Sequence, residues 1–193
     1  VQLLRSYSVD GVVLASSELP PGFAEAFAET GLPVVHAFGR AGQRAQVNVV
    51  GIDNVVAGRM AAQTLLARGY RDIGFLGGPS TASTTQDRLA GFMAGAGAAA
   101  SVVNCFAGAY SFEAGRAQMA EQLRGQPAEA YFCADDVLTI GALAAAQNAG
   151  LTVPRDLGLL GLHDMEMAGW GNIDLTTIHQ PFGAIIDASV DLM

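Results

Sequence analysis

The sequence is poor in cysteine, in charge and in basic residues, and each shortage excludes a class of protein. Its two cysteines, Cys105 and Cys133, are too few for a disulfide framework or a cysteine-based metal site. Only 15% of the 193 residues are charged, ten of them are Lys or Arg, and the net charge is −8. An acidic chain repels nucleic-acid phosphates and anionic membranes, so we do not expect these residues to bind either partner.

The sequence also lacks an apolar run long enough to span a membrane, and its first residues do not have the pattern of a signal peptide. It opens on VQLLRSYSVDGVVLAS, which is typical of the interior of a fold, and it closes on AIIDASVDLM within a helical pattern. We therefore expect it to be a fragment of a longer chain. Hydrophobic residues make up 51% of it, which is enough to build a sizeable core.

Short apolar runs rich in β-branched residues recur along the chain and predict strands. They cover residues 11–15, 33–37, 47–52, 72–78, 102–106, 130–134 and 157–162. Longer helical patterns separate most of them. The clearest follows Asp53 and Asn54, where an Asx side chain can cap a helix, and others cover residues 111–125 and 136–149. This alternation predicts an α/β protein whose parallel sheets are covered by helices on both faces.

Polar and aromatic residues follow these predicted strands, at the point where each strand ends. In an open parallel sheet, ligands bind at the carboxyl ends of the strands, so we expect these residues to gather at one edge. They are Phe38, Arg88, Tyr110, Asp135, Asp136, His163 and Asp164. Aromatic faces, carboxylates, an arginine and an imidazole together suit a small polyhydroxylated ligand.

Each of these residues also has a purely structural explanation. Of Asp135 and Asp136, we expect one to cap the following helix and to leave the other free. His163 taken alone fits a satisfied histidine at a strand end, and Tyr110 fits half-buried packing equally well. Arg88 is harder to explain structurally, because it would lie near the positive end of a helix that we expect to begin near Thr84. The hydroxyl run before it, STASTT, offers caps for that helix or hydrogen bonds to a ligand.

The motifs of common enzymes are missing from the sequence. It has no Gly-x-Ser-x-Gly elbow and no His-Glu-x-x-His, and GGPSTAST is neither a dinucleotide-binding fingerprint nor a P-loop. A hard metal would require Asp135, Asp136, His163 and Asp164 to converge, which the sequence alone does not indicate. We expect no enzymatic activity, no metal and no cofactor.

Several longer segments resemble one family. VDGVVLAS, IDNVVAGRMAAQTLLARGYRDIGFLGGP, RLAGF, YFCADDVLTIGALAAAQNAGLTVPRDLGLLG and LTTIHQP occur here in the order found in the effector-binding core of LacI/GalR-type bacterial transcriptional repressors. The resemblance covers nearly the whole chain. It implies a fold like that of type I periplasmic binding proteins, in which two Rossmann-like lobes with parallel sheets close on a ligand between them. It implies a first lobe of residues 1–50 and 181–193, a second lobe of residues 51–180, and a helix-turn-helix domain that is absent from this chain.

The resemblance also implies roles for individual residues. Arg88 in RLAGF matches an arginine that clamps effector hydroxyls or a carbonyl, and Tyr110 matches an aromatic residue against which the effector packs. Asp135 stands where the family usually has asparagine, and His163 where it usually has aspartate. Because position 163 is histidine instead of aspartate, the site loses a side chain that accepts through two oxygens and gains one that can donate.

Two further residues complete the predicted ligand-binding set. Phe38 stands where the family often has an acid, and Gln180, at a crossover between the lobes, either contacts the ligand or positions the hinge. These departures from the family pattern leave the effector open. A sugar is the first expectation, and a sugar acid or a nucleoside-like ligand are the alternatives.

The function implied by the resemblance is that of a cytoplasmic, homodimeric repressor that responds to a small-molecule effector. It would bind operator DNA only through the absent N-terminal domain, and it would not bind a membrane. Two alternatives remain at this point. One is a periplasmic sugar-binding protein of a transport system, and the other is an enzyme of the same fold class that uses Asp135 or His163.

Overall fold

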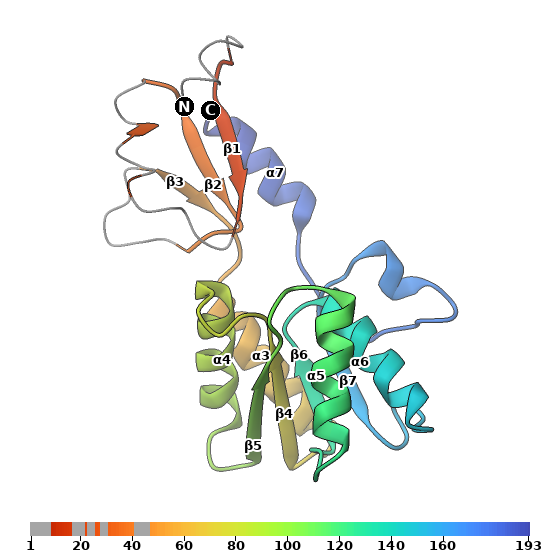
Figure 1. Cartoon of the computed structure of the whole chain (residues 1–193). Coiled ribbons are helices and arrows are strands. Elements are labelled where there is room, and N and C mark those ends of the chain that lie inside the picture. Colours follow the sequence, from red (N-terminus) through yellow and green to blue (C-terminus); the bar gives the residue numbers. More distant parts are fainter. Residues whose placement is uncertain (1–8, 17–21, 23–25, 28–30, 41–46) are drawn as a thin grey trace. The chain divides into compact units, whose positions relative to one another are not determined.

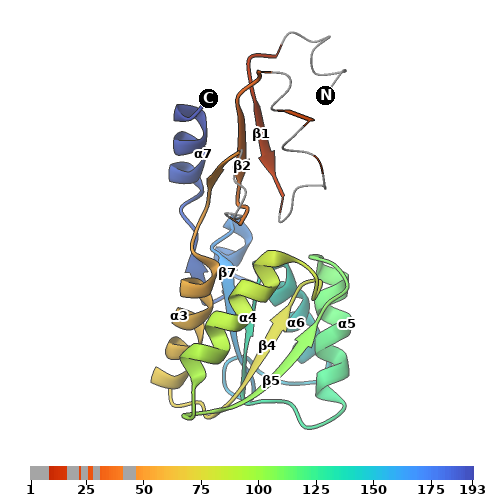
Figure 2. The ribbon, with the colours of Figure 1, turned by 90° about the vertical axis from the view of Figure 1, so that its left-hand side faces the viewer.

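The computed structural model describes residues 9–16, 22, 26–27, 31–40 and 47–193. The chain divides into two compact units. The first unit consists of residues 1–52 together with residues 181–193, and the second unit consists of residues 53–180. Figures 1 and 2 show both units from two directions.

The first unit contains a three-stranded parallel sheet in the order β1-β2-β3. The strands are β1 (Val12–Ala15), β2 (Val34–Ala37) and β3 (Asn48–Val50). Helix α7 (Phe182–Asp191) contacts β2 and β3. Its buried Ile185 and the buried Val35 of β2 belong to the core of this unit.

The second unit is built on a five-stranded parallel sheet in the order β5-β4-β6-β7-β8. Its strands are β4 (Asp72–Gly77), β5 (Ser101–Phe106), β6 (Ala130–Cys133), β7 (Gly158–His163) and β8 (Thr177–His179). Strand β6 is buried along its whole length and β4 over all but its first residue, as expected for strands covered on both faces. Because all five strands run in the same direction, their carboxyl ends form one edge.

Helices cover both faces of this sheet (Figures 1 and 2). They are α3 (Asn54–Ala67), α4 (Ser83–Ala96), α5 (Phe112–Leu123) and α6 (Asp136–Asn148), with a short 3₁₀ turn, η1 (Glu166–Gly169), after β7. Helices α3 and α4 pack together on one face, and α5 and α6 pack together on the other. Polar N-caps begin three of them: Asp53 accepts a hydrogen bond from Val56 N, Ser111 from Ala114 N and Asp135 from Val137 N.

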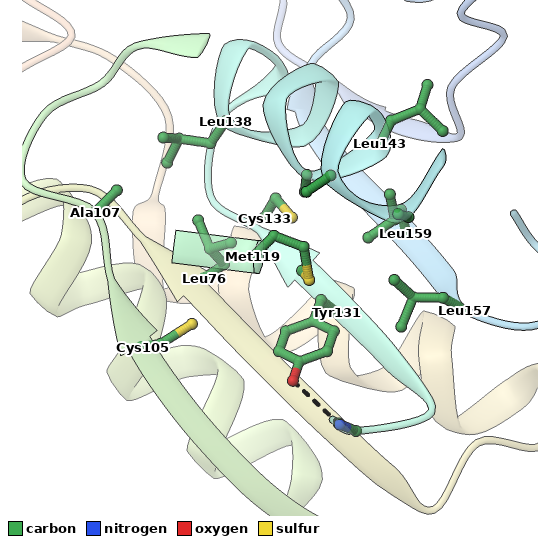
Figure 3. Packing of buried hydrophobic residues seen from close by; sticks show 14 residues of the cluster. Leu76, Cys105, Ala107, Met119, Tyr131, Cys133, Leu138, Leu143, Leu157 and Leu159 are labelled. Carbon is green, nitrogen blue, oxygen red and sulfur yellow. Dashed lines mark hydrogen bonds between the residues drawn. The ribbon is translucent and has the colours of Figure 1, made fainter. Parts of the chain in front are cut away.

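One hydrophobic cluster fills the space between the sheet and the pair α5–α6 (Figure 3). It joins Leu76 of β4 and Tyr131 of β6 to Met119 of α5 and Leu138 of α6, all of them fully buried. The hydroxyl group of Tyr131 accepts a hydrogen bond from the main-chain N–H of Ala128, so the polar end of this ring is satisfied within the core.

The predicted α/β fold with parallel sheets is confirmed, and every predicted strand is present within a few residues of its expected bounds. Strand β8 was not predicted, because its three residues include a single aliphatic side chain, Ile178, and form no apolar run. Among the described residues, no helix is long and apolar enough to cross a membrane.

The start of α4 differs from the expectation. Its N-cap is Ala82, which makes no side-chain capping bond, so the hydroxyl run does not supply the N-cap. The hydroxyl groups of Thr84 and Thr85 are hydrogen-bonded instead to the phenol oxygen of Tyr110.

Candidate functional site

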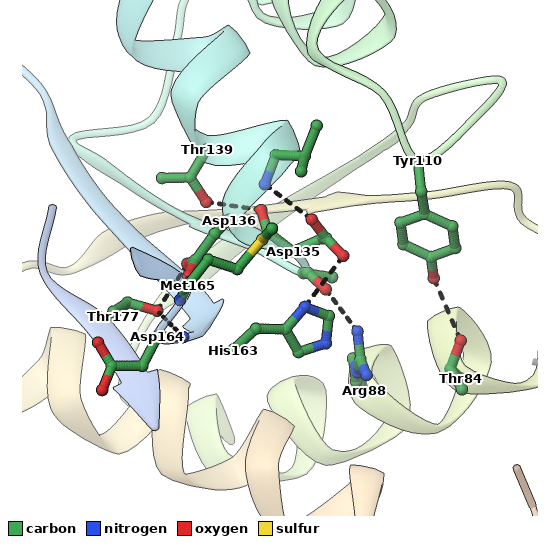
Figure 4. A network of polar contacts seen from close by, with 12 residues as sticks. Thr84, Arg88, Tyr110, Asp135, Asp136, Thr139, His163, Asp164, Met165 and Thr177 are labelled. Atoms are coloured by element: carbon green, nitrogen blue, oxygen red, sulfur yellow. Dashed lines mark hydrogen bonds and ion pairs between the residues drawn. The ribbon is translucent and has the colours of Figure 1, made fainter. Parts of the chain in front are cut away.

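Five of the six predicted site residues lie at the carboxyl edge of the second unit's sheet, and Figure 4 shows four of them, Arg88, Tyr110, Asp135 and His163. Each follows a different strand. Arg88 comes from α4 after β4, Tyr110 from the loop after β5, Asp135 from the turn after β6, His163 from the end of β7, and Gln180 from the residue after β8. The strand topology therefore collects at one edge side chains that are up to 92 residues apart in sequence.

Arg88 is buried, with 5% of its surface exposed. Its Nε donates to Oδ1 of Asn54 over 2.8 Å, and its Nη1 donates to the main-chain oxygen of Ala134 over 2.5 Å. Burial lowers the pKa of the guanidinium, whereas Tyr110 and the carboxylate of Asp135 raise it. An arginine stays protonated under ordinary conditions, so the structure holds a fixed cation at this edge.

Two glycines set the position of Arg88. A Cβ at Gly58 of α3 would overlap the main-chain oxygen of Arg88, and a Cβ at Gly91 of α4 would overlap the main-chain oxygen of Val55. Helices α3 and α4 therefore approach each other backbone to backbone. This close approach brings Asn54, the first residue of α3, within reach of the Arg88 side chain.

Tyr110 lies across the glycine turn that follows β4. A Cβ at Gly78 would overlap its ring, and its hydroxyl oxygen lies 2.6 Å from Oγ1 of Thr85 and 3.2 Å from Oγ1 of Thr84. The contact with Gly78 fixes the plane of the half-buried ring, and the two threonine contacts hold its hydroxyl oxygen. The close approach of Tyr110 also explains why glycine stands at position 78.

The two neighbouring aspartates have different roles, and neither is free. Asp135 caps α6 with one oxygen, Oδ1, at 2.7 Å from Val137 N, and its other oxygen, Oδ2, lies 3.1 Å from Nδ1 of His163. Asp136 is fully buried and accepts hydrogen bonds from Oγ1 of Thr177 and from the main-chain N–H of Met165. The expectation that one aspartate is left free is therefore wrong.

Burial raises the pKa of the Asp136 carboxyl, although the bonds from Thr177 and Met165 oppose this shift. A Cβ at Gly161 of β7 would overlap Oδ1 of Asp136, so the strand and this carboxyl group are in close contact. Asp136 therefore joins α6 to β7, to β8 and to the turn before η1. Its contacts are those of a structural residue.

His163 and Asp164 have an unusual backbone for residues other than glycine. Their φ angles are 118° and 59°, in the region that non-glycine residues rarely adopt. Each side chain belongs to a histidine–carboxylate pair, because His163 meets Asp135 and Asp164 Oδ2 lies 2.9 Å from Nδ1 of His179. The first pair is mostly buried, with 17% and 13% of its side-chain surfaces exposed, whereas the second is exposed.

Gln180 is buried, with 2% of its surface exposed, and its main-chain N–H donates to the carbonyl oxygen of His163. Among the residues that the structure describes, its side-chain oxygen Oε1 has no hydrogen-bond partner. A buried acceptor without a partner is unusual, because each such group costs free energy.

Phe38, the sixth predicted residue, belongs to the first unit. It directly follows β2, has a φ of 65° and is half-buried. Its ring packs against that of Phe182 at the start of α7, with the ring centroids 5.3 Å apart. Both aromatic residues lie in the first unit, and the contact between them fixes the ring of Phe38.

Sequence reasoning missed two groups of this site. Asn54, which bonds Arg88, was read only as part of a helix start, and the hydroxyls that hold Tyr110 were read as helix caps. Over the described parts of the chain, no group of three or more His, Cys, Asp or Glu residues is arranged to hold a metal ion. The polar groups at this edge can donate to, and accept from, a small polar molecule.

Comparison with known proteins gives a family for this arrangement. Residues 62–193 match the sequence model of a family described as periplasmic binding protein-like domain. The chain is 33% identical, over its whole length, to the HTH-type transcriptional repressor PurR of Escherichia coli. It spans 58% of the length of that repressor.

Solved structures agree with this match. A regulatory protein of the LacI family from Chloroflexus aggregans is 29% identical, with a TM-score of 0.83 over 98% of this chain and 69% of the other. The transcription regulator GntR from Chromobacterium violaceum is 32% identical, with a TM-score of 0.80 over 97% of this chain and 71% of the other. All three similar proteins are regulators.

Proposed function

Because this chain belongs to the periplasmic binding protein-like domain family, as it occurs in LacI/GalR-type regulators, we propose that it is the effector-binding core of a transcriptional repressor. The observation that carries the proposal is the match of the whole chain to PurR, a repressor of which it spans only part. DNA binding would then reside in a segment of the intact protein outside these residues. The acidic charge of this core suits a role in which it does not itself meet DNA.

The proposed effector is a small sugar-like molecule, and a sugar acid or a nucleoside-like compound are the alternatives. Arg88 provides a fixed cationic donor, Tyr110 provides a ring held against Gly78, and Gln180 provides an acceptor with no described partner. The pair Asp135–His163 completes the polar set.

The intact protein is proposed to be a cytoplasmic homodimer whose affinity for DNA changes when the effector binds. The size of that change is limited by the difference between the effector's affinities for the two states of the protein. The proposal includes no catalytic residue, metal or cofactor. We assign the polar groups of the candidate site to ligand binding and not to catalysis. The similar proteins are regulators, which favours this proposal over a transport protein or an enzyme.

A thermal-shift screen of the intact protein tests the proposal. The panel contains D-glucose, D-galactose, D-ribose, D-gluconate and adenosine, because a ligand that binds only the folded state raises the melting temperature. Each hit is then titrated into the intact protein bound to promoter DNA from its own gene neighbourhood. A hit that changes the affinity for DNA is expected, whereas a hit that leaves it unchanged contradicts the regulatory role.

Matched variants place the binding site. Arg88→Lys and Tyr110→Ala are expected to abolish the thermal shift, because they remove the fixed guanidinium and the ring. Arg116→Ala is the control, since Arg116 is exposed on α5 and pairs with Glu113 three residues earlier. Equal shifts in all three variants would place the effector elsewhere.

A further inference from the structure

The turn after β7, residues 163–165, is bonded to a buried carboxyl group. Asp136, the first residue of α6, is fully buried, and its Oδ2 accepts the main-chain N–H of Met165 over 2.9 Å (Figure 4). Its Oδ1 accepts the hydroxyl group of Thr177 on β8 over 2.6 Å, and that hydroxyl oxygen in turn accepts the main-chain N–H of Asp164 over 3.3 Å. Two consecutive N–H groups of the turn are therefore linked to one carboxyl group, directly or through Thr177.

The main chain of this turn requires such restraints. His163 has a φ of 118° and Asp164 a φ of 59°, and residues with a Cβ keep such conformations only where their surroundings hold them. The main-chain N–H of Gln180 donates to the carbonyl oxygen of His163 over 3.4 Å and holds the start of the turn. The bonds to Thr177 and Asp136 hold the two residues that follow.

Glycine at position 161 makes room for this arrangement. Gly161 of β7 is paired in register with Thr177 of β8. A Cβ at position 161 would overlap Oδ1 of Asp136 and crowd Oγ1 of Thr177. The pairing of the strands therefore places the hydroxyl group, and the absence of a side chain on β7 leaves space for the carboxyl group.

We propose that Asp136 and Thr177 are positioning residues of the candidate site, which hold the turn that carries His163. Neither side chain needs to touch the effector, because both act through the main chain of residues 164 and 165. Loss of either bond should release the turn, and with it His163, from its place at the carboxyl edge. The part of this inference that concerns effector affinity rests on the proposed function, whereas the restraint on the turn does not.

Thr177→Val and Thr177→Ser separate the hydroxyl group from the shape of the side chain. Valine keeps the branched shape, but it leaves the N–H of Asp164 without its acceptor and Oδ1 of Asp136 without its donor. Serine keeps the hydroxyl group and should restore both bonds.

Asp136→Asn changes the other end of the same bond. An amide has one acceptor oxygen, so its NH2 group must face one of the two donors, Thr177 or Met165. Because Thr177→Val and Asp136→Asn alter opposite ends of one bond, either variant decides the result if the other does not fold. Thr64→Val is the matched control, since the hydroxyl group of Thr64 donates within α3, to the main-chain oxygen of Met60.

The experiment is amide hydrogen exchange of the intact protein, followed by NMR. The main-chain N–H groups of Asp164 and Met165 report opening of the turn, and that of the buried Phe132 in β6 reports opening of the whole unit. In Thr177→Val and Asp136→Asn, exchange at the turn should rise by about tenfold more than exchange at Phe132. In Thr177→Ser and Thr64→Val it should not.

Equal increases at the turn and at Phe132, or no increase at the turn, would overturn the proposal. In the first case the two side chains would contribute only to the general stability of the unit. In the second case the pairing of β7 with β8 would hold the turn without them.

The effector half is measured with D-glucose, D-galactose and D-ribose as probes. Thr177→Val should weaken the binding of a sugar that binds the wild type by about tenfold, whereas Thr177→Ser and Thr64→Val should keep it within about twofold. Wild-type affinity in Thr177→Val overturns this half. If none of the sugars binds the wild type, the proposed sugar effector fails while the exchange rates still decide whether the turn is held.

Discussion

The Nε–H of Arg88 donates to Oδ1 of Asn54, the first residue of α3, across the two helices that meet through Gly58 and Gly91. The most buried cation of the candidate site is therefore oriented by a residue that follows the helix cap Asp53. The close contact between α3 and α4 therefore determines how the guanidinium of Arg88 is oriented.

Asn54→Ala should destabilise the second unit by about 1–3 kcal/mol, because it leaves the Nε–H of a buried arginine without an acceptor. The free energy of unfolding is measured by urea denaturation. Asn148→Ala is the control, since Asn148 is exposed at the end of α6, and it should have no measurable effect. Equal stability of the two variants would show that the Arg88–Asn54 bond contributes nothing.

Gly58→Ala should destabilise the protein by about 1–3 kcal/mol, because the added methyl group would overlap the main-chain oxygen of Arg88 and force the helices apart. Alanine in place of a helical glycine is otherwise favourable by up to about 1 kcal/mol. Gly183→Ala in α7, where a Cβ would meet open space, should therefore be neutral or stabilising. Thermal denaturation of both variants distinguishes close packing from helix propensity.

Asp136→Asn should change how stability depends on pH. Burial raises the folded-state pKa of Asp136 above its ordinary value of 3.8, so the protonated carboxyl stabilises the folded state. This contribution is fully present below pH 3.8 and is lost as the pH rises through the folded-state pKa. The unfolding free energy of the wild type relative to the variant should therefore fall from acidic to neutral pH. Urea titrations of both proteins across that range would refute the assignment if the difference rose or stayed constant.

Cys105 and Cys133 should resist alkylation in the folded protein. Both thiols are buried, and burial raises the pKa of Cys105 to about 12 and raises that of Cys133 as well. Alkylation requires the thiolate, which is then scarce at neutral pH. Mass spectrometry after brief iodoacetamide treatment should find neither cysteine modified, and both modified in guanidinium chloride. Rapid labelling of the folded protein would mean that the sheet opens locally.

Local patterns were enough to predict every described strand except β8, a helix cap at Asp53 or Asn54, a helix cap at Asp135 or Asp136, and the α/β class, because each depends on residues near one another in sequence. The convergence of Arg88, Tyr110 and His163 on one edge followed from the rule that parallel strands end together.

The errors arose where a partner lies far away in the chain. The hydroxyl of Thr85 was read as a possible cap, but its partner Tyr110 is 25 residues further on. Asp136 was expected to be free as the alternative to a capping Asp135, but Thr177, 41 residues away, and Met165 occupy its oxygens. The positive φ of His163 has no signal in the sequence, because a φ of 118° lies outside the left-handed helical region in which histidine is enriched.

In the second unit, the glycines that hold helices together are different residues from those of the candidate site. The pair α5–α6 repeats the arrangement of α3–α4, since a Cβ at Gly115 would crowd Leu138 and one at Gly141 would overlap the main-chain oxygen of Phe112. Helices held by backbone contact do not depend on which side chains follow the strands. If the proposed function is correct, we expect ligand preference to change through positions such as 110, 135 and 163 while the glycines keep the helix pairs in place.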